Sequence, residues 1–235
     1  MPLKYTVRRG VPEDLPALWP IAEAAFESDT EAYWTRLWRD AASAEELAAA
    51  AGPWWTAWQR REMATPGKHF WVATAAARED DARDRGEEEI VAFVSWQQPL
   101  SEVDPNAGKT DAEKAAEKAA AAAEWPPCMD PSILDVRRAK HAEVMRRELG
   151  ESWRDMWVTQ IMAVHPSHQR KGLATMLMRR VMDKVEESGA GAILVATPEG
   201  RKTYNKLGFK DVCGYSLPFD KYDVWLMQWK GSREP

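Results

Sequence analysis

The stretch from Met156 to Thr175, MWVTQIMAVHPSHQRKGLAT, constrains the fold more than any other part of the chain. Its first part, 156–164, is apolar except for Thr159 and Gln160. Such a run between charged flanks predicts a strand that is buried on both faces. A polar turn at 165–168 follows, and the next segment places large apolar residues at helical spacing. The sequence therefore predicts a buried strand, a turn and a helix in immediate succession.

The start of that helix has the properties of an anion-binding site. The first backbone N–H groups of a helix have no acceptor within the helix and point outward. Arg170 and Lys171 add positive charge at this point. Gly172 and Ala174 are small enough to let a phosphate approach the backbone closely. The segment therefore predicts that a phosphate-bearing ligand binds where the helix begins.

Four segments resemble one known family, the GNAT superfamily of N-acetyltransferases. Residues 169–174, Gln-Arg-Lys-Gly-Leu-Ala, match its acyl-CoA signature Q/R-x-x-G-x-G/A. Ala-Val-His-Pro at 163–166 and Tyr-Asn-Lys-Leu-Gly-Phe at 204–209 are also similar to that family, as is the Pro-Glu-Asp-Leu at 12–15 after a short strand. On these motifs the chain looks like a fungal or bacterial GNAT-domain protein with an enlarged middle insertion.

The resemblance implies a mixed α/β (α+β) GNAT fold. Its central, mostly antiparallel sheet would have about six to seven strands, with a parallel pair at the cofactor cleft and helices on both faces. The first strand of that pair would be 156–164, and the second would be the buried run GAILVAT at 191–197. We expect a single acetyltransferase domain over 1–235, with a helical insertion at about 97–150.

Several further elements follow from the residues themselves. Ser43–Glu46 forms a capping box that starts a helix, and Gly52-Pro53 predicts its end, with a Trp-rich helix following. The runs 69–75 and 89–96 predict an antiparallel hairpin around a highly charged tip. Within the insertion, 111–124 predicts an exposed Ala-rich helix and 132–149 an amphipathic one.

Two features have alternative interpretations. The 13 tryptophans include a cluster at 34–58, which either packs helices on the sheet or also walls the pocket for the acceptor, as this region does in the family. The insertion at 97–150 is either a cover near the acceptor side or an elaboration of the surface.

The resemblance also implies the cofactor, acetyl-CoA acting as a co-substrate, with no metal. Pantetheine would enter between the parallel strands and bond to their backbone groups, and the pyrophosphate would sit on the amides of 170–175. A backbone N–H at 162–164 would polarise the acetyl carbonyl. The residues implied to bind the cofactor are Met162, Ala163, Val164, Gln169, Arg170, Lys171, Gly172, Leu173, Ala174 and Thr175.

Tyr204 lies at the position of the tyrosine that, in many GNAT enzymes, protonates the departing CoA thiolate. The alternative is a core tyrosine packed under the cofactor. The resemblance does not identify a general base in this sequence. Some family members have a glutamate on the central strand, but the corresponding position here, near Val158, is apolar. Asp155, Glu31 and His165 are candidates by proximity, and a water chain is equally compatible.

Composition narrows the function classes. A net charge of −5 and a pI near 5.5 do not favour binding to nucleic acid. No apolar run approaches the ~20 residues that a membrane-spanning helix needs. The N-terminus lacks the apolar core of a secretory signal, and two distant cysteines suggest unpaired thiols in the cytoplasm. A P-loop nucleotide binder is excluded because its motif is absent.

The leading hypothesis is therefore an acyltransferase that moves an acetyl group from acetyl-CoA to a primary amine by direct attack in a ternary complex. The alternative is a non-catalytic acyl-CoA-binding module that senses or recruits. An acidic chain with Trp-lined helices favours a small-molecule amine over a protein as the acceptor. We expect a monomer or a homodimer.

Overall fold

A seven-stranded sheet forms the centre of the computed structural model, which describes residues 3–26, 36–77, 88–218 and 222–231. The strand order is β1-β2-β3-β4-β5-β7-β6. Neighbouring strands are antiparallel except for β4 and β5, which are parallel. This arrangement confirms the predicted sheet with one parallel pair. The strands are β1 (Leu3–Arg9), β2 (Lys68–Ala77), β3 (Glu89–Gln97), β4 (Met156–Val164), β5 (Gly191–Ala196), β6 (Lys210–Ser216) and β7 (Asp223–Trp229).

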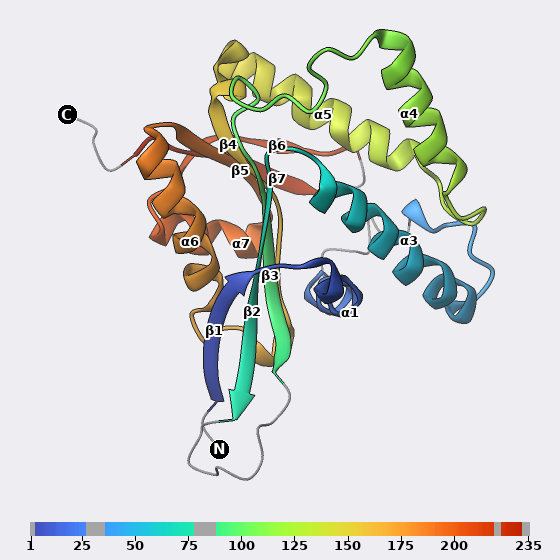
Figure 1. Cartoon of the computed structure of the whole chain (residues 1–235), viewed down its shortest axis with the longest axis horizontal. Helices are drawn as coiled ribbons and strands as arrows, with labels where there is room; N and C mark the ends of the chain where they lie inside the picture. Colours follow the sequence, from blue (N-terminus) through green and yellow to red (C-terminus); the bar gives the residue numbers. More distant parts are fainter. Residues whose placement is uncertain (1–2, 27–35, 78–87, 219–221, 232–235) are drawn as a thin grey trace.

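Helices cover both faces of the sheet (Figure 1). Helices α6 and α7 share one apolar core with β2, β3 and β5, whereas α1 and α3 form a second core against the other face. None of the helices within the described ranges is long and apolar enough to cross a membrane. The helices are α1 (Leu15–Ala25), α3 (Ala44–Ala64), α4 (Asp111–Ala123), α5 (Ser132–Leu149), α6 (Leu173–Ser188) and α7 (Pro198–Lys206), with 3-10 turns at Pro12–Asp14, Gly150–Asp155 and Pro166–His168.

The parallel strands stay together only at their first residues. They pair at Met156–Gly191, Trp157–Ala192 and Val158–Ile193, and no pair follows. In contrast, β4 remains paired with β3 as far as Val164. A register shift leaves Gln160 on β4 without a partner on β3, which is a β-bulge. The sheet therefore opens between β4 and β5 in its middle.

This opening corrects the prediction that 156–164 is buried on both faces. Only Trp157 and Ala163 of β4 are fully buried, and Gln160 is exposed. The apolar composition was interpreted correctly as a strand of the sheet. However, an apolar run cannot distinguish packing against protein from facing a cavity, because both need the same side chains.

The predicted helix end at Gly52-Pro53 is also wrong, because α3 continues through both residues to Ala64. Ser43 does cap the helix, accepting a hydrogen bond from the N–H of Glu46. Pro53 is exposed, so its missing N–H costs one bond at the surface, while Trp54 and Trp55 on the next positions are 7% and 3% exposed. Burial of these indoles outweighs the broken bond.

The remaining predicted elements are confirmed where the structure describes them. Strands β2 and β3 form the expected antiparallel hairpin, whose tip at 78–87 lies outside the described residues. Helix α5 has the predicted bounds. Helix α4 is exposed along its length, with no buried residue. Helices α4 and α5 thus both lie in the segment between β3 and β4.

Candidate active site

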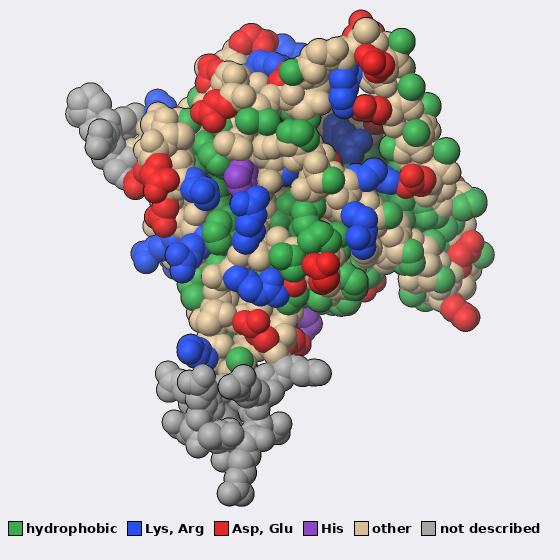
Figure 2. Space-filling model, in the orientation of Figure 1, with side chains coloured by type: hydrophobic (Ala, Val, Ile, Leu, Met, Phe, Trp, Pro, Cys, Tyr) green, Lys and Arg blue, Asp and Glu red, His purple; other side chains and the backbone are tan. Residues whose placement is uncertain are grey.

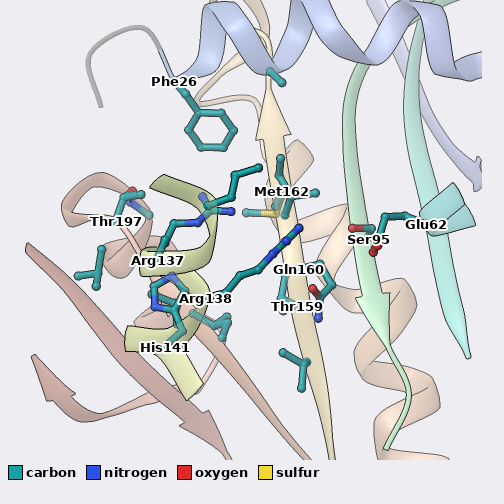
Figure 3. Close-up of a pocket in the computed structure, with 18 of the residues that line it drawn as sticks. Phe26, Glu62, Ser95, Arg137, Arg138, His141, Thr159, Gln160, Met162 and Thr197 are labelled. Atoms are coloured by element: carbon teal, nitrogen blue, oxygen red, sulfur yellow. The ribbon is translucent and has the colours of Figure 1, made fainter. Parts of the chain in front are cut away.

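A cavity of about 520 Å³ opens where β4 and β5 separate. Residues 158–162 of β4 and 193–195 of β5 form its floor. Helices α1 and α3 wall one side and α5 walls another (Figure 3), and α7 contributes Gly200 and Tyr204 to the lining. A volume of this size is typical of sites for small molecules. The separation of β4 and β5 thus forms a pocket large enough for a small molecule.

Tryptophans form the apolar wall of the cavity. The rings of Trp54 and Trp58 stack, with centroids 5.9 Å apart and an angle of 12° between their planes. Trp19 and Trp55 lie beside them with centroids 5.9 Å apart, and all four line the cavity. Trp54 and Trp55 are also largely buried in the second core. The two interpretations of this cluster are therefore compatible, whereas Trp34 lies outside the described residues.

The insertion supplies the opposite wall through α5. Arg137, Arg138 and His141 line the cavity from this helix (Figure 3). The Nδ1 atom of His141 lies 2.6 Å from the hydroxyl oxygen of Tyr215 on β6. Burial, aided by the positive charge of Arg137, lowers the pKa of His141 to about 4, so its imidazole is neutral near pH 7. This placement supports the cover interpretation for α5, whereas α4 stays on the surface.

Neither of the two proposed bases within the described residues lines the cavity. Asp155 and His165 do not line it, and Glu31 lies outside the described residues. The cavity carboxylates are Glu23 and Glu62, and Glu62 pairs with Lys68 at 2.6 Å. Sequence reasoning missed Glu62, although it continues the helical face of Trp55 and Trp58 on α3.

No group of His, Cys, Asp and Glu side chains in the described parts of the chain is arranged to hold a metal ion.

Tyr204 lies on α7 at the closed end of the cavity and is 7% exposed. Its ring packs against Phe209, with centroids 6.1 Å apart. Burial raises the pKa of its hydroxyl above the ordinary value of 10, so the group holds its proton at neutral pH. The protonated hydroxyl is therefore a hydrogen-bond donor at neutral pH.

The predicted anion-binding segment surrounds the start of α6, at the carboxyl end of β4. Gly172 caps the helix with a φ of 84°, and Arg170 has a φ of 63°. Arg170, Lys171 and Gly172 are exposed, whereas the side chain of Leu173 is buried, so Leu173 can offer a ligand only its backbone N–H. The ends of parallel strands are common ligand sites in open sheets.

The other predicted cofactor residues are divided between two environments. Met162 lines the cavity, Ala163 is buried in the second core, and Val164 packs against the first. The amide nitrogen of Gln169 donates to the carbonyl of Val164 at 3.2 Å. Ala174 and Thr175 are half-buried in the first turn of α6. Cavity and anion-binding segment are therefore joined through the end of β4.

Positive side chains also gather near α6. Figure 2 shows Lys and Arg side chains over α6 and the strands beside it. Arg179 and Arg180 are exposed on this helix. Asp183, Glu186 and Glu187 lie on the same helix and balance its cations, so α6 itself has no net charge and the unbalanced cations are Arg170 and Lys171 at its start.

Comparison with known proteins finds the same family over part of the chain. Residues 139–211 match the family model described as an acetyltransferase (GNAT) domain. The chain carries a GNAT acetyltransferase domain. The matched residues of this GNAT domain run from α5 to the start of β6 and so include the anion-binding segment and Tyr204. The protein is an acyltransferase, and the resemblance found in its motifs is confirmed.

Solved structures show the same fold at low sequence identity. The acetyltransferase described as histone acetyltransferase HPA2 and related acetyltransferase from Corynebacterium glutamicum is 18% identical, with a TM-score of 0.55 over 98% of both chains. FeeM, an N-acyl amino acid synthase from uncultured soil microbes, is 12% identical, with a TM-score of 0.52 over 97% of this chain and 92% of FeeM. No curated protein matches the sequence.

Proposed function

We propose that this GNAT domain, as a single domain over 1–235, transfers the acetyl group of acetyl-CoA to the primary amine of a small molecule. The amine attacks the thioester directly while both substrates are bound. The observation that carries the proposal is the cavity at the gap between β4 and β5, with the buried hydroxyl of Tyr204 at its end and the exposed start of α6 beyond β4.

The residues at this gap fit coenzyme A. Past Val158, the edge of β4 that faces β5 has no strand partner, so its backbone groups are available for the pantetheine amides. A Cβ added to Gly172 would meet nothing within 4 Å, so there is open space for a phosphate beside the first amides of α6. Met162–Val164 would hold pantetheine, and Gln169–Thr175 would hold the pyrophosphate.

Acetyl-CoA supplies a thioester, an activated acyl group with a thiol as leaving group. The amine nitrogen forms a bond to the acetyl carbon, and the bond from carbon to sulfur breaks. Tyr204 donates its proton to the sulfur and recovers one from solvent, while the amine loses its proton. Backbone N–H groups of β4 at the gap would stabilise the oxyanion. The products are the N-acetylated amine and free CoA.

The size and walls of the cavity support a small acceptor. It is enclosed by α1, α3 and α5, and its apolar side is a set of stacked indoles. Such a surface suits one apolar or aromatic group rather than an extended chain. The amine proton passes to solvent, because Glu62 is paired with Lys68 and β4 carries no acid.

The compartment proposed is the cytoplasm. Cys128 and Cys213 are both free thiols, and Cys128 is buried. Thiols that stay unpaired fit a reducing environment.

A non-catalytic acyl-CoA-binding module is the second candidate, favoured by the lack of a free carboxylate on β4. Release of CoA thiol from acetyl-CoA with a panel of primary amines separates the two. The enzyme hypothesis predicts release that depends on the amine. CoA binding without release for any amine would favour the module.

The variant Tyr204→Phe tests the proton donor. It keeps the ring that packs against Phe209 and removes only the hydroxyl. We expect kcat to fall about 10-fold or more, with CoA affinity nearly unchanged, because the hydroxyl acts only as the sulfur departs. Steady-state kinetics with a calorimetric titration of CoA measures both quantities. Unchanged turnover would make Tyr204 a core residue only.

A further inference from the structure

The wall of the cavity formed by α5 is cationic. In Figure 3, the side chains of Arg137 and Arg138 both reach from α5 into the space between Thr197 and Met162 of β4. Both residues line the cavity. Consecutive residues of a helix point in directions about 100° apart, so two arginines that reach into one space form a specific feature of this wall.

The positive charge of Arg138 is not neutralised within the cavity. Arg138 makes no ion pair or hydrogen bond with any residue of the described ranges. Of the two cavity carboxylates, Glu62 is already paired with Lys68, which is 10% exposed. Glu23 is exposed, on α1, in the opposite wall. The chain as a whole has a net charge of −5, so the local excess contrasts with the rest of the molecule.

His141 adds a neutral polar group beside the arginines. Its low pKa keeps it uncharged, and its contact with Tyr215 fixes the ring. When the hydroxyl of Tyr215 donates to Nδ1, the other ring nitrogen carries the proton and can itself donate. The wall then offers the guanidinium group of Arg138 and one further donor, which together suit an anion.

We propose that the acceptor amine carries an anionic group, a carboxylate or its phosphonate equivalent, and that Arg138, with Arg137 beside it, binds that group. This inference rests on the proposed acetyl transfer and names its substrate class. The opposite wall of stacked Trp54 and Trp58 would take an apolar or aromatic side chain. The acceptor would thus be an amino acid or an analogue of one.

The position of the arginines places the anionic group near the reacting amine. Their side chains reach the space between Thr197 and β4, next to the gap where the thioester would lie. The two ends of an α-amino acid, which are separated by one carbon, fit this short distance. The start of α6, proposed to bind pyrophosphate, lies on the other face of the sheet, so the α5 arginines are not needed for CoA.

The test compares matched acceptors. Phenylalanine, its amide and its phosphonate analogue share the amine and the aromatic ring and differ in the anionic group. We expect wild-type kcat/KM for the acid, the phosphonate or both to exceed that for the amide at least about 10-fold. Arg138→Gln should remove this preference while leaving CoA affinity unchanged. Arg146→Gln is the control, since Arg146 is exposed on α5 outside the cavity lining, and it should keep the preference.

The outcomes separate this inference from the proposed function. Equal use of acid and amide, or an equal loss for both in Arg138→Gln, would overturn the anionic acceptor but not acetyl transfer. No thiol release with any amine would overturn acetyl transfer. In that case binding tests the inference, by calorimetric titration of N-acetylphenylalanine and of its amide into the CoA-loaded protein. The wild type should bind the acid more tightly than the amide, and Arg138→Gln should bind both equally. Equal affinity for both in the wild type would overturn the inference.

Discussion

Two glycines with left-handed backbone bracket α6. Gly172 precedes it with a φ of 84°, and Gly189 follows it with a φ of 71°. A Cβ at either position would meet nothing within 4 Å. Glycine is favoured at both positions by the backbone conformation rather than by a lack of space. Only Gly172 lies at the end of the helix where backbone amides point outward. The sequence motif identified Gly172, whereas no motif includes Glu62 or Arg138.

These glycines give a matched pair of variants. Gly172→Glu should lower CoA affinity about 100-fold or more, because a carboxylate at the start of α6 repels the pyrophosphate. Gly189→Glu imposes similar backbone strain, roughly 1 kcal/mol, at the other end and should bind CoA normally. Calorimetric titration with CoA measures affinity, and thermal unfolding reports the strain. Equal affinity in both variants would place the phosphate elsewhere.

At the scale of elements, α3 shows packing overriding a local stop signal. Gly52 lies against Trp19, since a Cβ there would stand 3.1 Å from Cδ1 of the indole. Its role is close packing of two helices rather than termination. Pro53 faces solvent, where the lost hydrogen bond costs least. By contrast, α5 begins after Pro131 and ends before Gly150, as the sequence predicts, because nothing within that segment conflicts with the helix.

Substitutions in α3 should show the difference between Gly52, which packs on Trp19, and Pro53, which faces solvent. Pro53→Ala is expected to raise the free energy of unfolding by about 1–3 kcal/mol, since it restores a backbone donor at an exposed position. Gly52→Ala should gain clearly less than the usual ~1 kcal/mol, because its methyl group presses on Trp19. Denaturant unfolding of both variants checks this. A larger gain for Gly52→Ala than for Pro53→Ala would contradict the packing account.

At the scale of the whole molecule, the cavity is assembled from segments far apart in the sequence. Its floor comes from β4 and β5, and its walls come from α1, α3, α5 and α7. Burying His141 in this assembly, where it contacts Tyr215 on β6, is what lowers its pKa. The stability of the fold is therefore linked to pH through a group on the insertion.

This linkage has a definite sign. The unfolded chain protonates His141 near pH 6.5, whereas the folded protein does so only near pH 4. Between these values the unfolded state binds more protons, so the free energy of unfolding falls as the pH falls, by roughly 3 kcal/mol in total. His141→Gln should lack this component. The difference between wild type and variant, from denaturant unfolding at steps from pH 7 to 4, isolates it from other groups, and a constant difference would contradict the linkage.

The sequence by itself determined the strand-turn-helix at 156–188, the parallel pair, the anion-binding segment and the position of Tyr204. These depend on neighbours in the chain, on period and on motif, which are local properties. Only the tertiary structure decided that α3 continues past Pro53, that β4 faces a cavity, and that Glu62 and Arg138 border it. Those outcomes depend on contacts between residues far apart in the sequence, so they cannot be read from any single segment. The proposed cofactor site thus follows from a short motif, while the proposed acceptor site can be identified only in the folded structure.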